Sequence, residues 1–238
     1  MPRVQLVSDI HVEFHLDGGK SFVQSLDPTG VDALVIAGDL GNAAAEHRII
    51  RDFCARWPLV ILVLGNHSYY GSYFDIVHRR WDALEKKLPN LHVLRNKVVQ
   101  IGGALIGGTT LWFKADPLAP KHLLNDFHCI RKFEPRVYAE NAAAQTFLKQ
   151  TAGAVDLMVT HHIQTNQGIR PEYRGSPLNP FFVCPVAERL PKLPRVWCYG
   201  HTHTPMSFVA GGCAFVCNPF GYPHESKKAF QEKLLIEL

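Results

Sequence analysis

Five short apolar runs in this 238-residue chain each end in a polar residue that can bind a metal ion. The runs are rich in Val, Leu and Ile, which predicts buried β-strands at Val4–Val7, Ala33–Ala37, Leu59–Leu64, Leu157–Val159 and Val196–Tyr199. The polar residues that follow them are Ser8-Asp9-Ile10-His11, Gly38-Asp39, Gly65-Asn66-His67, Thr160-His161-His162 and Gly200-His201-Thr202-His203. Because the carboxyl ends of strands in open α/β sheets border one crevice, we expect these polar residues to meet there.

Helical patterns separate the predicted strands, and they cover Ala43–Trp57, Tyr73–Leu88 and Val137–Gln150. In the second pattern Phe74 and Trp81 share one apolar stripe, so both should be core residues. The alternation of strands and helices predicts an α/β layer structure.

Further strand-like segments flank two Gly-Gly pairs, which favours tight hairpins and hence mixed sheets. These segments are Val98–Ile101 with Ala104–Leu111, and Met206–Val209 with Cys213–Val216. A separate strand-like segment lies at Leu234–Leu238. Residues Ile163–Pro191 contain several prolines and few periodic apolar positions. They predict a long loop with one helical turn near Val186–Leu190, and loops of this length inside a compact domain are often functional lids.

The composition, 47% hydrophobic and 19% charged, fits one domain over residues 1–238. No stretch approaches the ~20 apolar residues of a membrane helix, and the first residues lack a signal-peptide pattern, so we expect a cytoplasmic protein with no membrane partner. The net charge of +4 comes from scattered Lys and Arg, which argues only weakly for nucleic acid. Six cysteines without a CxxC spacing suggest small buried residues in a reducing compartment.

The thirteen histidines are an unusually high number, and the potential ligands combine imidazole, carboxylate and amide groups without thiolate. Such donors suit Mn²⁺, Fe²⁺/³⁺ or Zn²⁺ in an open catalytic site. In Asp9-x-His11 and His201-x-His203 we expect an extended backbone that points both outer residues the same way. The glycines before Asp39, Asn66 and His201 should let the chain turn sharply.

In their order and spacing, the motifs DxH, GD, GNH, HH and GHTH resemble those of calcineurin-like metallophosphoesterases over nearly the whole chain. Three further stretches resemble the small bacterial Icc-related phosphoesterases, although we assign no physical role to them: Gly108–Trp112, Asn125–Phe127 and Asn218–Tyr222. The resemblance implies a four-layer αββα sandwich of two mixed β-sheets flanked by helices.

The resemblance also implies two metal ions, with Mn most favoured and Fe or Zn as alternatives. The first ion would be held by Asp9, His11 and His203, the second by Asn66, His161 and His201, and Asp39 would bridge both. A hydroxide shared by the two ions would attack a phosphoester, and His67 would be a catalytic group that stabilises charge or protonates the leaving group. His161 and His162 compete for one ligand position, and we choose His161 because adjacent strand residues point to opposite faces.

The chain departs from the phosphoprotein phosphatase motifs GDxxDRG and GNHE, because it has Gly38–Asn42 and Gly65–Ser68 at those positions. Without the second Asp, His67 has no obvious partner to orient it. Without the Arg, a phosphomonoester dianion loses a bidentate contact, so a small-molecule phosphodiester is favoured. A metal-dependent nuclease and a phosphoprotein phosphatase remain alternatives, and a non-catalytic scaffold is least favoured since all seven implied ligands are present.

Overall fold

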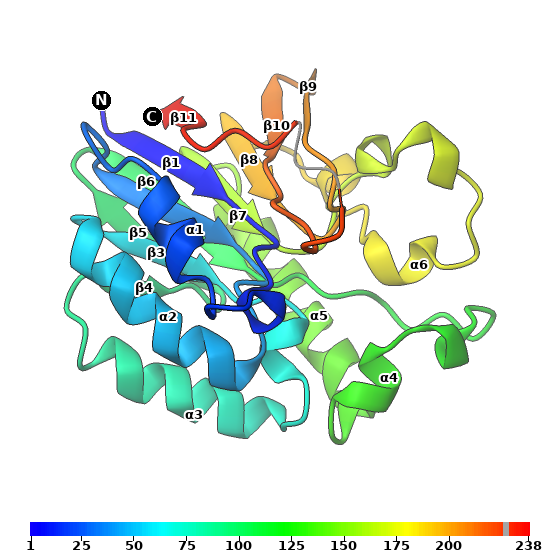
Figure 1. The fold of residues 1–238 in the computed structure, drawn as a ribbon. Helices are drawn as coiled ribbons and strands as arrows, with labels where there is room; N and C mark the ends of the chain where they lie inside the picture. Colours follow the sequence, from blue (N-terminus) through cyan, green and yellow to red (C-terminus); the bar gives the residue numbers. More distant parts are fainter. Residues whose placement is uncertain (226–228) are drawn as a thin grey trace.

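The eleven β-strands of the computed structural model form two sheets that pack face to face (Figure 1). Residues 1–225 and 229–238 are described. The strands are β1 Arg3–Val7, β2 Ala33–Ala37, β3 Val60–Val63, β4 Leu91–Val93, β5 Lys97–Ile101, β6 Ala104–Thr109, β7 Leu157–Thr160, β8 Val196–Tyr199, β9 Met206–Ala210, β10 Cys213–Cys217 and β11 Leu235–Glu237. The strand order is β11-β1-β2-β3-β4 in the first sheet and β5-β6-β7-β8-β10-β9 in the second.

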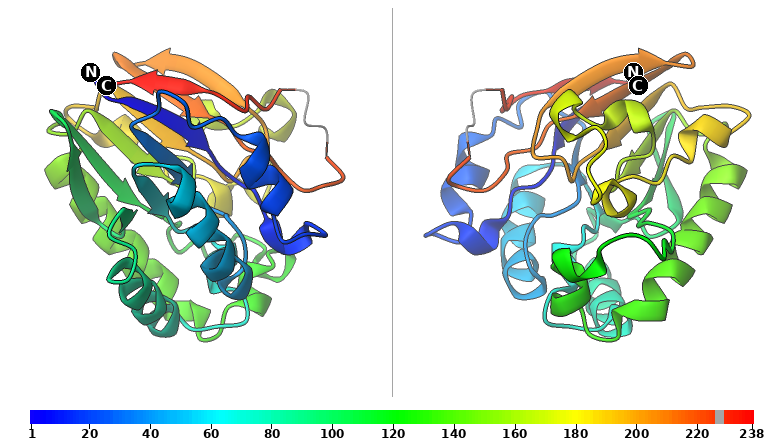
Figure 2. Two further views of the ribbon diagram at one scale, coloured as in Figure 1. Left: turned by 60° about the vertical axis from the view of Figure 1, so that its left-hand side comes forward. Right: turned by 90° about the vertical axis from the view of Figure 1, so that its right-hand side faces the viewer.

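The five apolar runs are confirmed as strands β1, β2, β3, β7 and β8. Within this set, β1 pairs parallel with β2, β2 with β3, and β7 with β8. Both predicted Gly-Gly hairpins are also confirmed, since β5 pairs antiparallel with β6 and β10 pairs antiparallel with β9. Strand β11 adds an antiparallel edge to β1, which brings the two termini side by side (Figure 2). Both sheets are therefore mixed.

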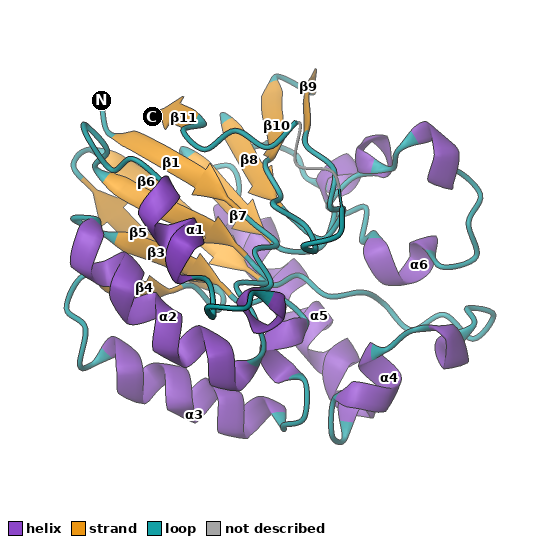
Figure 3. Cartoon of the chain, viewed as in Figure 1, coloured by secondary structure: helices purple, strands orange, loops and turns teal. Residues whose placement is uncertain are grey.

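Helices cover the outer face of each sheet and complete four layers (Figure 3). On the first sheet lie α1 Lys20–Ser25, α2 Ala43–Arg56 and α3 Phe74–Glu85, and on the second lies α5 Phe133–Thr151. Two short helices, α4 Asp126–Cys129 and α6 Asn179–Phe182, lie outside these layers. The predicted αββα sandwich is confirmed, whereas α1 and β4 were not predicted because each is very short.

The continuous apolar runs arise because the central strands are buried on both faces. In β2, Leu34 and Ile36 pack beneath the helices, while Val35 and its alternate neighbours pack against the second sheet. As predicted, Phe74 and Trp81 belong to the core beneath the helices. A strand that contacts two cores needs apolar side chains at every position, so alternation disappears from its sequence.

Two long connections leave the second sheet on the same side, and we call them the β6–α5 segment (residues 110–132) and the β7–β8 segment (residues 161–195). The helical turn predicted near Val186–Leu190 is present at Ala187–Arg189. The predicted loop also contains turns at Asn166–Gly168 and Pro171–Tyr173, as well as α6. These turns were missed because three or four residues carry no measurable periodicity.

Two of the stretches that carried no assigned role fasten the sheets together. Thr110 Oγ1 donates a hydrogen bond to the Leu64 carbonyl at 2.8 Å and so joins the ends of β6 and β3. Buried Asn218 donates from Nδ2 to the carbonyls of Leu6 and Gln231, and its Oδ1 accepts the Gln231 backbone N–H. These bonds hold the chain beyond β10 against β1.

Among the described helices none is both long and apolar enough to cross a membrane. All six cysteines are free, and four of them, Cys184, Cys198, Cys213 and Cys217, are buried.

A buried carboxyl group, Glu46, connects α2 with α3 and with the turn after β3. Ser68 Oγ donates to its Oε2 at 2.8 Å, and Trp81 Nε1 donates to its Oε1 at 3.0 Å. Burial raises the pKa of Glu46 from 4.5 to about 8, so the folded protein keeps this group protonated at neutral pH. The contribution of Glu46 to the free energy of unfolding is therefore complete below its unfolded-state pKa and is lost as pH rises through its folded-state pKa.

We therefore expect wild type to lose stability relative to Glu46→Gln as pH rises. Between about pH 5.5 and 7.5 the difference in free energy of unfolding should change by up to about 1.4 kcal/mol per pH unit. Urea denaturation of both proteins across this range measures it. The same change at exposed Glu232 is the control, and a Glu46→Gln difference as independent of pH as that of the control would contradict the prediction.

Candidate metal centre

The ends of the five parallel strands converge and bring all seven predicted ligand residues into one cluster. Five of the seven adopt left-handed backbone angles, with φ between 47° and 71°: Asp9, His11, Asp39, His201 and His203. The expectation of an extended backbone in the two x-spaced pairs is therefore wrong. Left-handed φ is costly for residues other than glycine and collects at functional sites, where the surrounding fold maintains it.

The glycines before these residues serve mainly to allow close approach, and only Gly38 has a positive φ. A Cβ on Gly65 would lie 1.9 Å from Asp39 Oδ1, and one on Gly38 would lie 2.1 Å from His161 Nδ1. A Cβ on Gly200 would lie 2.6 Å from the Ala37 carbonyl oxygen. Any side chain at these positions would displace a neighbouring group of the cluster.

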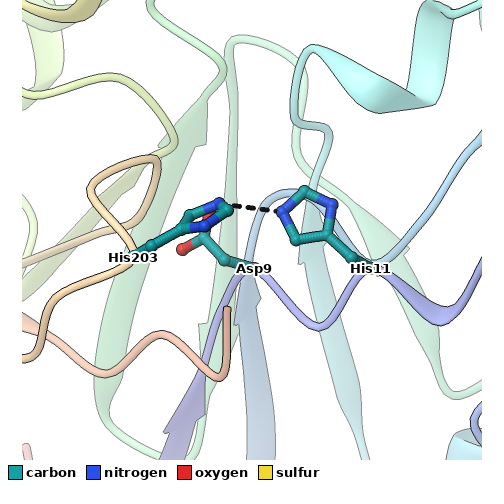
Figure 4. Close-up of side chains that lie close together, drawn as sticks. All are labelled: Asp9, His11 and His203. Carbon is teal, nitrogen blue, oxygen red and sulfur yellow. Dashed lines mark hydrogen bonds and ion pairs between the residues drawn. The ribbon is translucent and has the colours of Figure 1, made fainter. Parts of the chain in front are cut away.

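The first group of donors consists of Asp9, His11 and His203 (Figure 4). His11 Nε2 lies 2.9 Å from His203 Nε2, which in turn lies 3.9 Å from Asp9 Oδ1. Glu225 Oε2 lies 3.0 Å from His203 Nδ1, so the proton belongs on Nδ1 and the Nε2 lone pair faces the cluster. Two imidazole nitrogens and a carboxylate thus point at one small volume.

The second group consists of Asp39, His161 and His201. His161 Nδ1 donates to the Ala37 carbonyl oxygen at 3.1 Å, and His161 Nε2 donates to Asn66 Oδ1 at 3.0 Å. Burial lowers the pKa of His161, but the neighbouring Asp39 outweighs it and raises the pKa to about 9. His201 Nε2 is buried and has no hydrogen-bond partner within the described residues. Burial, together with His162 and His161, holds the pKa of His201 well below its usual value and keeps it neutral.

Asp39 lies between the two groups. Its Oδ2 is 3.8 Å from His11 Nε2 and 3.4 Å from His161 Nε2, and its Oδ1 accepts the His67 backbone N–H at 3.0 Å. Burial alone would raise the pKa of Asp39, but the charge of His161 and His67 outweighs it and lowers the pKa well below 3.8. The buried Asp39 is therefore ionised, and its charge is compensated by the neighbouring groups.

His162 lies next to this cluster but contributes no donor atom to either group. Its ring centroid is 4.4 Å from that of His201, and its Nδ1 lies 3.2 Å from the Thr110 carbonyl oxygen. Burial and the neighbouring His161 lower the pKa of His162 to about 3, so the ring is neutral. Of the two adjacent histidines, only His161 faces Asp39 and Asn66.

The expectation that His67 lacks an orienting partner is wrong. Glu13 Oε1 accepts a hydrogen bond from His67 Nδ1 at 2.8 Å, and Tyr70 stacks on the ring at a centroid distance of 4.3 Å. Burial lowers the pKa of His67, but Asp39 and Glu13 together raise it above its ordinary value. Glu13 lies in the 3-10 turn Val12–Phe14, two residues after His11. The carboxylate that orients His67 therefore comes from the chain after β1, whereas the phosphoprotein motif has its Asp in the chain after β2.

Asp126 is a second carboxylate whose role was not evident from sequence. Its Oδ1 accepts hydrogen bonds from Asn66 Nδ2 and from the Tyr70 hydroxyl, both at 2.8 Å. This contact fixes the orientation of the Asn66 amide, so that Oδ1 faces His161 rather than solvent. Burial raises the pKa of Asp126. The Asn125–Phe127 stretch thereby acquires a physical role.

The donor set fits divalent cations. It combines carboxylate, amide and imidazole donors, includes the unpartnered His201 Nε2, and excludes thiolate. His161 and His203 each bind an outer partner through Nδ1 and direct Nε2 inward, as in metal sites whose ligands are held by outer hydrogen bonds.

Comparisons with known proteins show the family to which the chain belongs. The family model for calcineurin-like phosphoesterases matches residues 2–205. An uncharacterized protein of Acanthamoeba polyphaga mimivirus is 25% identical, with 94% of this chain and 93% of that protein covered. The solved structure of phosphopantetheinyl hydrolase from Mycobacterium tuberculosis has a TM-score of 0.78 at 19% identity, covering 98% of this chain and 94% of that one. The last likeness concerns the fold alone.

We expect Asp126→Ala to weaken metal binding roughly 10- to 100-fold, because the Asn66 amide loses the partner that fixes its orientation. Isothermal titration of the metal-free protein with Mn²⁺ measures this. Asp126→Asn retains an acceptor for Asn66 and should recover most of the affinity. Tyr70→Phe removes the other bond to Asp126 and also the longer 3.3 Å contact of Asn66 Nδ2 with the Tyr70 hydroxyl, and it should cost less affinity than Asp126→Ala. A loss in Asp126→Asn as large as that in Asp126→Ala would refute the orienting role of Asp126.

Proposed function

The chain belongs to the calcineurin-like phosphoesterase family, and we propose that it is a metal-dependent hydrolase that uses two metal ions and favours phosphodiesters over phosphomonoesters. The observation that carries the proposal is the position of Asp39 between two groups of inward-facing donors. A carboxylate placed in this way can serve both groups at once. A structural site would need only one group, and it would have no reason to face a cavity.

In this proposal Asp9, His11 and His203 hold one ion, Asn66, His161 and His201 hold the other, and Asp39 bridges them. When bound, the pair supplies positive charge to the phosphoryl oxygens and acidifies water enough to make a nucleophile at neutral pH. We favour Mn²⁺, with Fe or Zn as alternatives, because the donors are imidazole and oxygen. The free cysteines support a reducing, cytoplasmic location.

His67 is proposed to act on the substrate rather than on the metals. Its Nδ1 is occupied by Glu13, which leaves Nε2 for the substrate side, where the Tyr222 hydroxyl lies 3.4 Å away. Glu13 favours the protonated ring, and Asp39 raises the pKa of His67 in the same direction. A protonated imidazole at the cavity surface can donate its Nε2 proton to a departing alkoxide.

The preference for diesters rests on the supply of positive charge around the cavity. The Arg of the related phosphoprotein motif corresponds to Ala43 in this chain, a buried residue with no charge. Asn42, at the position of the second Asp, caps α2 by accepting the Ala44 and Ala45 backbone N–H groups. Arg170 lines the cavity, but its guanidinium is paired with Glu172 and bonded to Thr204 Oγ1. A phosphomonoester dianion would need an additional cation that the described lining does not offer.

The central experiment measures Mn²⁺-dependent hydrolysis of bis(p-nitrophenyl) phosphate and p-nitrophenyl phosphate by wild type and Asp39→Asn. We expect the diester to be hydrolysed at least as fast as the monoester. Asp39→Asn should abolish turnover and release metal, because an amide cannot offset the charge of two cations. Metal analysis of the same samples is the second measurement. Near-native turnover with both ions retained would disprove bridging, and far higher monoester activity would disprove the substrate class.

The substrate panel should include a phosphopantetheinyl ester and short DNA as well as cyclic nucleotides. The first is included because the phosphopantetheinyl hydrolase has a similar fold. The second addresses the nuclease alternative, for which the scattered basic residues offer little support.

We expect His67→Ala to reduce the hydrolysis of alkyl diesters more than that of nitrophenyl diesters. General acid catalysis typically contributes 10²–10⁴-fold and is needed most when the leaving alkoxide is strongly basic. Comparing kcat for both leaving groups at saturating Mn²⁺ measures the difference. Glu13→Gln should show a weaker form of the same bias, because it leaves the imidazole in place. Equal losses on both leaving groups would assign His67 a positioning role instead.

A further inference from the structure

A cavity of about 470 Å³ extends from the candidate metal centre into the space between the β6–α5 and β7–β8 segments. At one end it is lined by centre residues, namely Asp39, Asn66, His67, His201 and His203. The remainder is lined by side chains of the two segments, whose helices α4 and α6 project on the same side of the molecule (Figure 1). Cavities of roughly 300–1,000 Å³ can enclose most of a small ligand.

The walls beyond the centre are largely apolar. Leu123 and Leu124 come from the β6–α5 segment, and the facing wall from the β7–β8 segment contains Ile163, Ile169, Leu178 and Phe182. The Phe182 ring lies against the His201 ring at a centroid distance of 4.5 Å. The apolar wall is therefore continuous with the metal centre rather than a separate hollow.

The facing wall is anchored at both of its ends. Ile163 forms a parallel bridge with Val183, so the two ends of the wall segment lie side by side. Arg170 donates to Thr204 Oγ1 at 2.7 Å and thereby joins the wall to the loop that carries His203. Gly168 packs so closely that a Cβ would lie 2.5 Å from Ile163 Cγ2. The wall is thus built into the fold next to the centre.

The charge of the walls excludes a polyanionic occupant. Arg170 is the only Lys or Arg among the described lining residues, and it is paired with Glu172. Nucleic acids bind through many unpaired cations that displace counterions from phosphates. An uncharged apolar group, by contrast, gains free energy by leaving water for such walls.

We propose that this cavity binds one ester substituent of the substrate, and that this substituent is an elongated, uncharged and largely apolar alcohol. The inference rests on the proposed phosphoesterase function, because the phosphoryl group must lie at the metal centre for its substituent to reach the cavity. It extends that function by naming the substrate class, which is phosphoesters of apolar alcohols. In this proposal the wall residues Ile169 and Leu178 determine specificity for the substituent.

The test uses methyl, propyl and hexyl p-nitrophenyl phosphates with Mn²⁺, all below micelle-forming concentrations. They share one leaving group and differ only in the remaining substituent. We expect kcat/KM to rise with chain length, by up to about fourfold for each buried methylene. A flat or falling series, or a dinucleotide hydrolysed better than the hexyl ester, would overturn the proposal.

Two wall variants, Ile169→Asn and Leu178→Asn, locate the effect. The readout is the ratio of kcat/KM for hexyl over methyl ester, which should fall severalfold towards one in both variants. The matched control is Leu118→Asn, because Leu118 is 92% exposed in the β6–α5 segment and does not line the cavity. A ratio that stays at the wild-type value in both wall variants would show that the chain binds elsewhere and overturn the proposal.

Binding of methyl and hexyl phosphonates, which are not hydrolysed, separates this inference from the proposed function. Tighter binding of the hexyl compound that is weakened in the wall variants supports the cavity assignment even if no ester is turned over. Hydrolysis of all esters with equal affinity for both phosphonates would retain the phosphoesterase function and overturn the cavity assignment. The two proposals therefore fail in different ways.

Discussion

The buried Asp39 carboxylate is the group on which the rest of the site depends. It lies among imidazole nitrogens of two different sheets, 3.8 Å from His11 and 3.4 Å from His161. A buried carboxylate is costly unless positive charge or hydrogen-bond donors compensate it, and here His161 and His67 lower the pKa of Asp39. Under the proposed function, bound cations would supply that positive charge instead. The αββα sandwich positions the donor cluster, because parallel strands of both sheets end at this point.

Three carboxylates orient residues of the site. Glu225 accepts from His203, Glu13 from His67 and Asp126 from Asn66, at distances of 2.8 to 3.0 Å. None lies in a strand: Glu13 belongs to the 3-10 turn Val12–Phe14, Asp126 begins α4, and Glu225 lies in the chain beyond β10. Such outer hydrogen bonds set the tautomer of an imidazole and the rotation of an amide, and these choices decide which atom faces a metal.

Much of the fold and of the donor cluster could be predicted from the chain because both leave local signals. Strands buried on two faces appear as continuous apolar runs, as in β2, and the motif residues follow them directly. Glu13 and Asp126 could not be predicted, since their partners lie 54 and 60 residues away and neither pair has a fixed spacing. The left-handed backbone at Asp9 and His11 was also missed, because the x-spaced pair was interpreted as an extended strand, although Asp and His tolerate left-handed angles better than most residues.

Residues at the strand ends and residues of the cavity walls are under different physical constraints. Residues at strand ends are constrained by strained backbone and by glycines such as Gly65, so substitutions there disturb the donors themselves. The β6–α5 and β7–β8 segments contribute wall residues such as Leu178, which lines the cavity and is not one of the donors. The same segments also carry Asp126 and His161, so only wall positions of this kind have no direct role at the donors. Under the two proposals, a change at such a position alters the shape and polarity of the cavity while the same metal chemistry is retained.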